Sequence, residues 1–330
     1  MVRGPVAPKA AAAGASLVVL LAALSGCFCT DSPDSVLARP EAIEETPAIL
    51  LSPVREVGMG DLMLVPAPAE EPVLLGGDPE RVVLADRGGR VRRGWPDGAT
   101  VAHQAGTISA MASTGDGSLW IAGSAGLVRV RGDVPDAVRP WRLPDGGQPV
   151  IRALVAGKGG SLCATVDHGL IVLDPEAGTA RWLAGGPTPG WADGQGEAAA
   201  FHDPEGLIRQ GTDLFVADGG NHAIRIVSET GHVTTSVGGK PGLIDGPLAS
   251  ARLRNPRGLR HHPRWGILVC DTGNHALRRL GPARLDTIAG DGWPGTLPGS
   301  LPDVRLTAPF QMVGAWLLGA DGRLWHWESP

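Results

Sequence analysis

Two short stretches of the chain combine acidic, amide, imidazole and guanidinium side chains at one shared spacing. In each stretch Asn follows Asp by three residues, His comes next, and Arg lies three residues beyond His. The matching residues are Asp218, Asn221, His222 and Arg225 in the first stretch and Asp271, Asn274, His275 and Arg278 in the second. Carboxylate and imidazole groups bind divalent cations such as calcium and zinc, and a guanidinium group binds polar or anionic ligands.

A structural role competes with each of these chemical roles, and we favour the structural one. Asp and Asn cap tight turns and satisfy backbone donors. For Arg225 and Arg278 we favour a hydrogen bond or ion pair that links neighbouring strands or neighbouring blades. In the chemical alternative the eight residues form a binding rim, and the metal-ligand candidates among them are Asp218, His222, Asp271 and His275.

Both stretches belong to a longer internal repeat, whose clearest copies span about 193–244 and 245–297. The first copy has Asp193, Gly194, Phe201, Pro204 and Gly206 where the second has Asp245, Gly246, Leu253, Pro256 and Gly258. Each copy then alternates apolar and polar residues, turns through Gly-Asn, and alternates again, which predicts a β-hairpin. A repeat of this length supplies about four short strands, the unit of a propeller blade.

Four weaker hairpins flank the two repeats, at 81–93, 118–132, 161–174 and 315–327. We therefore predict an all-β fold, a single β-propeller with six four-stranded blades, with five or seven blades as the alternatives. The last blade stops after its third strand. An N-terminal strand near 48–52 or 61–65 would complete it and remove the exposed strand edges.

The segments 217–225 and 271–278 resemble the NHL repeat, named for its Asn-His-Leu signature, with Ala223 and Ala276 in place of the leucine. The preceding Asp-Gly and Pro-x-Gly residues strengthen the match. The region 193–290 is similar to the propeller of thioredoxin-linked NHL proteins and of bacterial NHL lipoproteins. The resemblance implies that the turn between the second and third strands opens on one rim, near a central channel. Because the chain has no C-x-x-C, we do not carry over a redox activity.

The N-terminal segment has the layout of a lipoprotein signal peptide over 1–26. A basic start precedes an alanine-rich apolar stretch, which ends in Leu24-Ser25-Gly26-Cys27. This sequence resembles the bacterial lipobox and implies cleavage before Cys27, acylation of its thiol and attachment to the lipid bilayer; an ordinary secreted protein is the alternative. Residues 27–46 are then the lipidated cysteine and a flexible tether, and 47–330 the propeller. Phe28 after the lipid site favours the outer membrane, facing the periplasm or the surface.

Composition agrees with a strand- and turn-rich exported protein. The 330 residues include 49 glycines and 29 prolines, about twice the usual share. The formal net charge of −5 disfavours nucleic acid as a partner. Cys163 and Cys270 lie in apolar segments and are predicted to be buried. No sequence motif of a serine hydrolase, zinc protease, P-loop or dinucleotide-binding enzyme occurs, so we assign no catalytic residue.

These features together predict a monomeric, membrane-anchored propeller that binds a protein, peptide or glycan in the bacterial cell envelope. A metal-dependent hydrolase or lyase with its site in the central channel is the first alternative. A purely structural envelope protein is the second. We expect no cofactor under the leading hypothesis, and calcium or zinc under the enzyme alternative.

Overall fold

The computed structural model describes five short strand segments before residue 102 and most of the chain from 107 to 327. The gaps in this second part are residue 133 and residues 263–264, 298–303, 314–315 and 321–322. Among the five early segments only Val91 has a described side chain. The predicted signal peptide, Cys27, the tether and the candidate strand at 48–52 lie outside the described residues. All described residues belong to the compact unit Ile49–Pro330.

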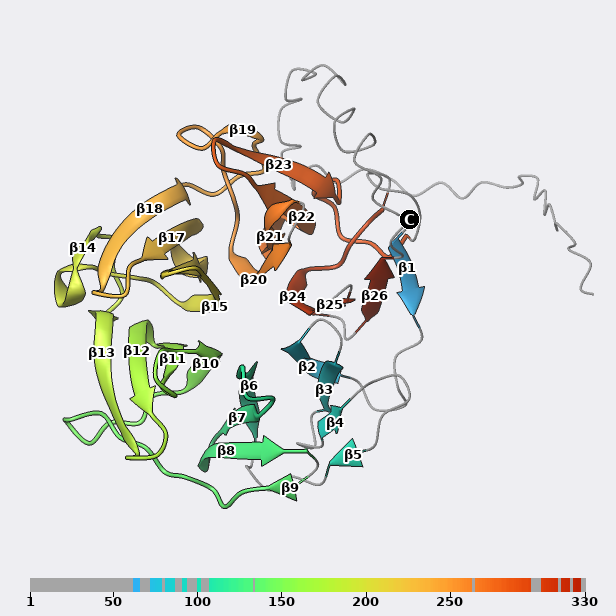
Figure 1. The fold of residues 1–330 in the computed structure, drawn as a ribbon. Coiled ribbons are helices and arrows are strands. Elements are labelled where there is room, and N and C mark those ends of the chain that lie inside the picture. The colour runs from blue at the N-terminus through green and yellow to red at the C-terminus, as the bar shows by residue number, and fades with distance from the viewer. Residues whose placement is uncertain are drawn as a thin grey trace, which may run out of the picture. The chain divides into compact units, whose positions relative to one another are not determined.

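The described strands form six antiparallel sheets, which we number as blades in chain order (Figure 1). Blade 1 contains β2 (Pro72–Asp78), β3 (Arg81–Asp86), β4 (Val91–Arg93) and β5 (Thr100–Val101). Blade 2 contains β6 (Ile108–Ser113), β7 (Leu119–Gly123), β8 (Gly126–Arg131) and β9 (Val134–Pro135). Blade 3 contains β10 (Ile151–Ala156), β11 (Leu162–Val166), β12 (His168–Asp174) and β13 (Thr179–Gly186).

Blades 4 and 5 each carry a short fifth strand at the outer edge, which the sequence did not predict. Blade 4 contains β15 (Pro204–Gln210), β16 (Asp213–Asp218), β17 (Ala223–Val227), β18 (His232–Gly238) and the edge strand β14 (Gly194–Gln195). Blade 5 contains β20 (Pro256–His262), β21 (Gly266–Asp271), β22 (Ala276–Leu280), β23 (Arg284–Ala289) and the edge strand β19 (Gly246–Pro247). Three 3₁₀ turns are η2 (Gly196–Ala198), η3 (Gly219–Asn221) and η4 (Thr272–Asn274).

The six predicted hairpins are all present, each as the second and third strands of a blade. The last of them belongs to blade 6, which contains β24 (Pro309–Val313), β25 (Trp316–Gly319), β26 (Leu324–Trp327) and β1 (Leu62–Val65). β1 pairs with β26 antiparallel, Leu62 opposite Trp327 and Val65 opposite Leu324. The predicted closure of the last blade by an N-terminal strand is therefore confirmed, with the segment at 61–65 supplying the strand.

The innermost strands of the blades make a closed ring. β2, β6, β10, β15, β20 and β24 contact one another in this order, and β24 also contacts β2. Figure 1 shows the six sheets around a common centre, with the first strand of each blade nearest to it. Each inner strand is an edge strand of its own sheet, so it pairs on one side only and its other edge faces the centre.

Every inner strand has a β-bulge at the same place, directly after the residue that pairs with the end of the second strand. The bulge positions are Val73, Ser109, Arg152, Glu205, Arg257 with Gly258, and Phe310. An extra residue in one strand re-aims its side chain away from the regular pleat. The bulges therefore place one position of every blade at the same end of the ring.

The apolar core lies between neighbouring blades. One cluster joins Leu170 of blade 3 to Val216 of blade 4, and another joins Leu268 of blade 5 to Leu317 of blade 6. Each fully buried leucine or valine contributes roughly 1.5–3 kcal/mol to folding, so these clusters hold the blades together. Cys163 and Cys270 are free and buried, as the sequence predicted. In the described part of the chain, no helix is long and apolar enough to cross a membrane.

Candidate functional site

Arg225 of blade 4 is completely buried and acts as a clamp inside its own repeat. Its Nη1 donates hydrogen bonds to Oδ2 of Asp218 (2.8 Å) and to the Ala200 carbonyl (3.1 Å). Its Nη2 donates to Oδ1 of Asp193 (2.6 Å) and to the Ala192 carbonyl (2.6 Å). The guanidinium thus fastens the segment before β15 to the hairpin of the same blade.

Blade 5 repeats this clamp with Arg278, whose side chain is also 0% exposed. Its Nη1 donates to Oδ2 of Asp271 (2.6 Å) and to the Arg252 carbonyl (3.1 Å). Its Nη2 donates to Oδ1 of Asp245 (2.6 Å) and to the Ile244 carbonyl (3.1 Å). The ion pairs favoured for both arginines from the sequence are present in the structure.

The aspartate and asparagine of each repeat complete the clamp from the turn side. In blade 4, Asn221 Nδ2 donates to the Gly190 carbonyl (2.8 Å) and to Asp218 Oδ2 (2.9 Å), while the His202 backbone N–H donates to Asp218 Oδ1 (2.8 Å). Burial raises the pKa of Asp218 and of Asp271, and the hydrogen bonds and the arginine charge oppose that shift. All of these donors and acceptors are used within the protein.

Asp193 and Asp245 are clamp residues that were not predicted from the sequence, where they served only to align the two repeats. Besides accepting from Arg225, Asp193 accepts from the Thr235 backbone N–H and from Thr235 Oγ1, both at 3.0 Å. Burial alone would raise the pKa of Asp193, but these bonds and the Arg225 guanidinium lower it below its ordinary value. The available signal was the Asp-Gly pair, which precedes the arginine at nearly the same distance in both copies.

The repeat histidines face the next blade along the ring. Each has an Nδ1 that accepts a hydrogen bond from a backbone N–H at the start of that blade, and the residue that donates has a positive φ. The pairs are His168 with Asp203 (3.2 Å), His222 with Asn255 (3.1 Å) and His275 with Ala308 (3.0 Å). Burial lowers the pKa of His222 and of His275. His222 and His275 therefore join neighbouring blades in their neutral form.

The structure thus brings the Asp, Asn and Arg of each repeat together within one blade and turns the His toward the next. Among the described residues, no group of three or more His, Cys, Asp and Glu side chains is placed to hold a metal ion. A metal site at Asp218, His222, Asp271 and His275 stays a prediction, as does a rim that contacts a ligand through all eight repeat residues.

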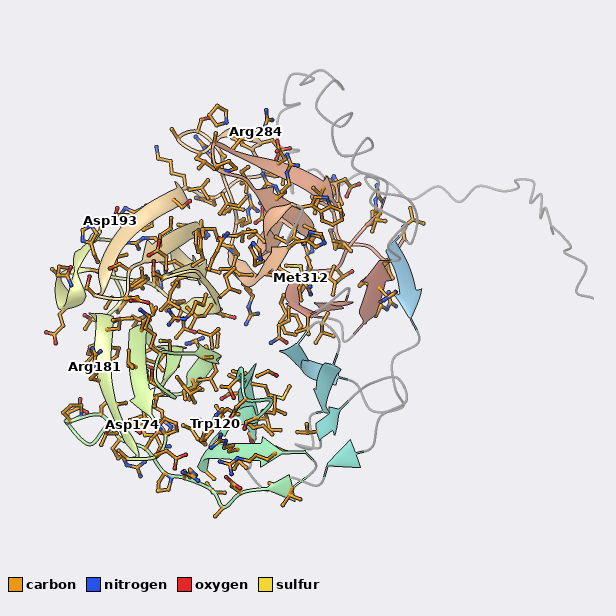
Figure 2. The ribbon with its side chains drawn as sticks, viewed as in Figure 1. Trp120, Asp174, Arg181, Asp193, Arg284 and Met312 are labelled. Carbon is orange, nitrogen blue, oxygen red and sulfur yellow. The ribbon has the colours of Figure 1, made fainter. Side chains whose placement is uncertain are left out.

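A different set of side chains surrounds a central channel of about 480 Å³. The channel is lined by β6, β10, β15, β20 and β24, and its lining includes the bulge residues Ser109, Arg152, Glu205, Arg257 and Phe310. In Figure 2 Met312, another lining residue, lies near the centre of the ring, whereas Asp193, Arg181 and Arg284 lie toward its outer edge. We call the ring of bulge residues the channel mouth.

Charges of opposite sign alternate along the channel mouth across blades 3, 4 and 5. Arg152 Nη2 lies 3.2 Å from Asp203 Oδ1, and Arg152 Nη1 lies 3.8 Å from Glu205 Oε1. On its other side Glu205 pairs through Oε2 with Arg257. The Arg257 guanidinium in turn lies 5.8 Å from the centroid of the Phe310 ring. Together with Asp203, which lies beside the mouth and does not line the channel, this chain of ion pairs has two positive and two negative groups.

The sequence reasoning did not identify Arg152, Glu205, Arg257 or Phe310. Glu205, Arg257 and Phe310 each follow a proline at the start of an inner strand, and two of these prolines belong to the aligned repeats. The position is the same in each blade, but its residue is Ser, Arg, Glu, Arg and Phe in blades 2 to 6, so a search for one recurring residue does not find it.

The six-bladed ring makes this protein a β-propeller. No family model matches the chain. Human NHL repeat-containing protein 2 is 37% identical over 93 residues, which cover 27% of this chain and 13% of the human protein. The bovine protein of the same name is 36% identical over 86 residues, covering 25% of this chain and 12% of that protein. The chain is thus a β-propeller that is similar over about a quarter of its length to NHL repeat-containing proteins, and it spans only about an eighth of their length.

Solved structures share the fold at low sequence identity. A structural genomics protein of unknown function from Bacteroides thetaiotaomicron has a TM-score of 0.64 and 15% identity, covering 81% of this chain and 76% of that one. An auxiliary nutrient binding protein from the same organism has a TM-score of 0.57 and 18% identity, covering 78% and 69%. At these identities the likeness concerns the fold.

Proposed function

We propose that this protein is an exported, lipid-anchored propeller that binds a protein, peptide or glycan at its channel mouth. The observation that carries the proposal is the set of bulge residues, one from each of five blades and of four residue types, around a channel of about 480 Å³. Ligand sites commonly have ~300–1,000 Å³ and a few convergent polar groups. The name of one structural neighbour, an auxiliary nutrient binding protein, agrees with a binding role.

The anchoring part of the proposal rests on Cys27 and the segment before it. Two or three acyl chains on this residue would hold the protein stably on a bilayer, whereas a single chain gives only marginal binding. We expect Cys27→Ser to abolish incorporation of radiolabelled palmitate and to release the protein from the membrane fraction. Cys29→Ser is the matched control and should do neither. Equal labelling of the Cys27→Ser variant would contradict the anchor.

The binding part is tested by closing the channel mouth. Ser109 lines the channel, whereas Ser124 lies in the exposed turn between β7 and β8. The full-length wild type, Ser109→Trp and Ser124→Trp are titrated against libraries of envelope proteins, peptides and oligosaccharides. We expect Ser109→Trp to lose a ligand that Ser124→Trp retains, with all three proteins melting at similar temperatures. If the wild type and both variants bind identically, or bind nothing, the proposal fails.

A further inference from the structure

The two arginines of the channel mouth keep most of their hydrogen-bonding capacity. A guanidinium has five N–H donors. Within the described part of the chain, Arg152 donates one hydrogen bond, to Asp203, and Arg257 contacts Glu205 Oε2 through both Nε and Nη2. Their side chains are 37% and 36% exposed. Both arginines line the channel, so donors are available there on blades 3 and 5, on either side of Glu205 in blade 4.

Acceptors lie between and beside these donors. Glu205 Oε1 is 3.8 Å from Arg152, beyond hydrogen-bond distance, so its lone pairs are open. Asp203 is 43% exposed, and its Oδ2 lies 3.7 Å from His202 Nε2. Hydrogen-bond donors and acceptors thus alternate at the mouth in the same order as the positive and negative groups of the ion pairs.

This alternation decides which kind of ligand fits. An anion that approaches Arg152 or Arg257 also approaches the carboxylate of Glu205, and a cation that approaches Glu205 meets both arginines. A ligand of one sign therefore gains little from a balanced row of charges. A hydroxyl group both donates and accepts, so it can bond a guanidinium and a carboxylate at once.

Phe310 supplies an apolar surface at the end of the same row. Its ring is half-buried, lines the channel and lies beside Arg257. An aromatic ring next to paired donors and acceptors suits a ligand with one apolar face and hydroxyl groups around its edge. Sugar rings have this construction.

We infer that the channel mouth binds a neutral, hydroxyl-rich ligand, an uncharged glycan, through Arg152, Glu205 and Arg257, with a sugar ring on Phe310. The inference rests on the proposed function and names the ligand class for the same site. Protein and peptide ligands are then the alternatives that a test has to separate from it.

The test uses the full-length chain on an array of neutral, uronic-acid-containing and amino-sugar-containing oligosaccharides. We expect binding to neutral members. Titration with the best of them should show about tenfold weaker binding for both Arg257→Ala and Glu205→Ala, since each removes one partner of a ligand hydroxyl. Arg254→Gln is the matched control, because this exposed arginine of the same region does not line the channel.

The response to Glu205→Ala separates a neutral ligand from an anionic one. At an anion site, removal of the carboxylate would strengthen binding, whereas at a glycan site it weakens binding. Preference for acidic or amino sugars, tighter binding by Glu205→Ala, or no oligosaccharide binding at all overturns the inference. In each of these cases the proposed function still stands if Ser109→Trp abolishes binding of a peptide or protein that Ser124→Trp retains.

Discussion

The arginines of the two repeat clamps and the arginines of the channel mouth differ in burial and in the number of hydrogen bonds that they make within the protein. Arg225 and Arg278 are 0% exposed and each makes four hydrogen bonds inside its own blade. Arg152 and Arg257 are more than a third exposed and leave most of their donors open to the channel. The first pair recurs at one position of the repeat, while the second pair occupies a position that changes from blade to blade.

The difference shows why the most recognisable residues of a repeat are not the best candidates for its function. The clamp residues recur in blades 4 and 5 because they do the same work there, which is to hold one blade together internally. A ligand contacts the channel once and needs a different group from each blade. Four changes would break or sharpen this comparison.

The largest effect is expected from Arg225→Ala. The substitution leaves Asp218 buried without its guanidinium partner, and loss of one member of a buried pair costs about 3–5 kcal/mol. The free energy of unfolding, from urea titration, measures it. Arg257→Ala is the matched control, and its part-exposed pair with Glu205 should cost less than about 1 kcal/mol. Equal losses in the two variants would remove the distinction between clamp and mouth.

A smaller effect is expected from Gly206→Ala, which forces blades 4 and 5 apart beside the mouth. A Cβ on Gly206 would lie 1.9 Å from the Arg257 carbonyl oxygen, a distance that requires the backbone to move. We expect a loss of about 1–3 kcal/mol in unfolding free energy and a displacement of the Arg257 backbone. Gly186→Ala, where a Cβ meets nothing within 4 Å, is the control and should be close to neutral. A wild-type melting curve for Gly206→Ala would contradict the close contact.

Acidification should weaken the histidine hydrogen bonds that link neighbouring blades. His222 and His275 have a lowered pKa, caused first by burial and for His222 also by the nearby Arg254 and His202. An unfolded histidine titrates near ~6.5, so below that pH the unfolded chain binds more protons and folding stability falls. The melting temperature should therefore drop between about pH 7 and pH 5. The drop in melting temperature should be smaller in the double variant His222→Asn/His275→Asn, because asparagine does not titrate in this range. Identical pH profiles of the wild type and the variant would argue against these histidine hydrogen bonds.

No effect is expected from removal of metal ions. The Nδ1 atoms of His222 and His275 already accept backbone hydrogen bonds, and both oxygens of Asp218 are occupied. Full-length protein purified without a tag or chelator should carry less than one equivalent of calcium or zinc by elemental analysis, and EDTA should leave its melting temperature unchanged. One tightly held equivalent, with a lower melting temperature in EDTA, would restore the metal-dependent hydrolase or lyase alternative.

Local pattern was sufficient for the strands and hairpins. The segments at 214–227 and 267–280 alternate and turn within fourteen residues, so their partners are adjacent in sequence. The closing strand was also predictable, because a last blade of three strands leaves an open edge that another strand must cover. The outer edge strands β14 and β19 are only two residues long and gave no pattern to detect.

The sequence by itself determined the repeat, the six hairpins, the buried cysteines and the residue types that hold blades 4 and 5 together internally. These follow from contacts between residues close in the chain, which leave a period in the sequence. Only the tertiary structure decided that Asp193 completes the Arg225 clamp, that His222 faces Asn255, and that Arg152, Glu205 and Arg257 meet at one mouth. Those contacts join residues 32 to 53 positions apart. They lie within one repeat or between consecutive blades, so they form only when the strands pack into blades and the blades pack against one another.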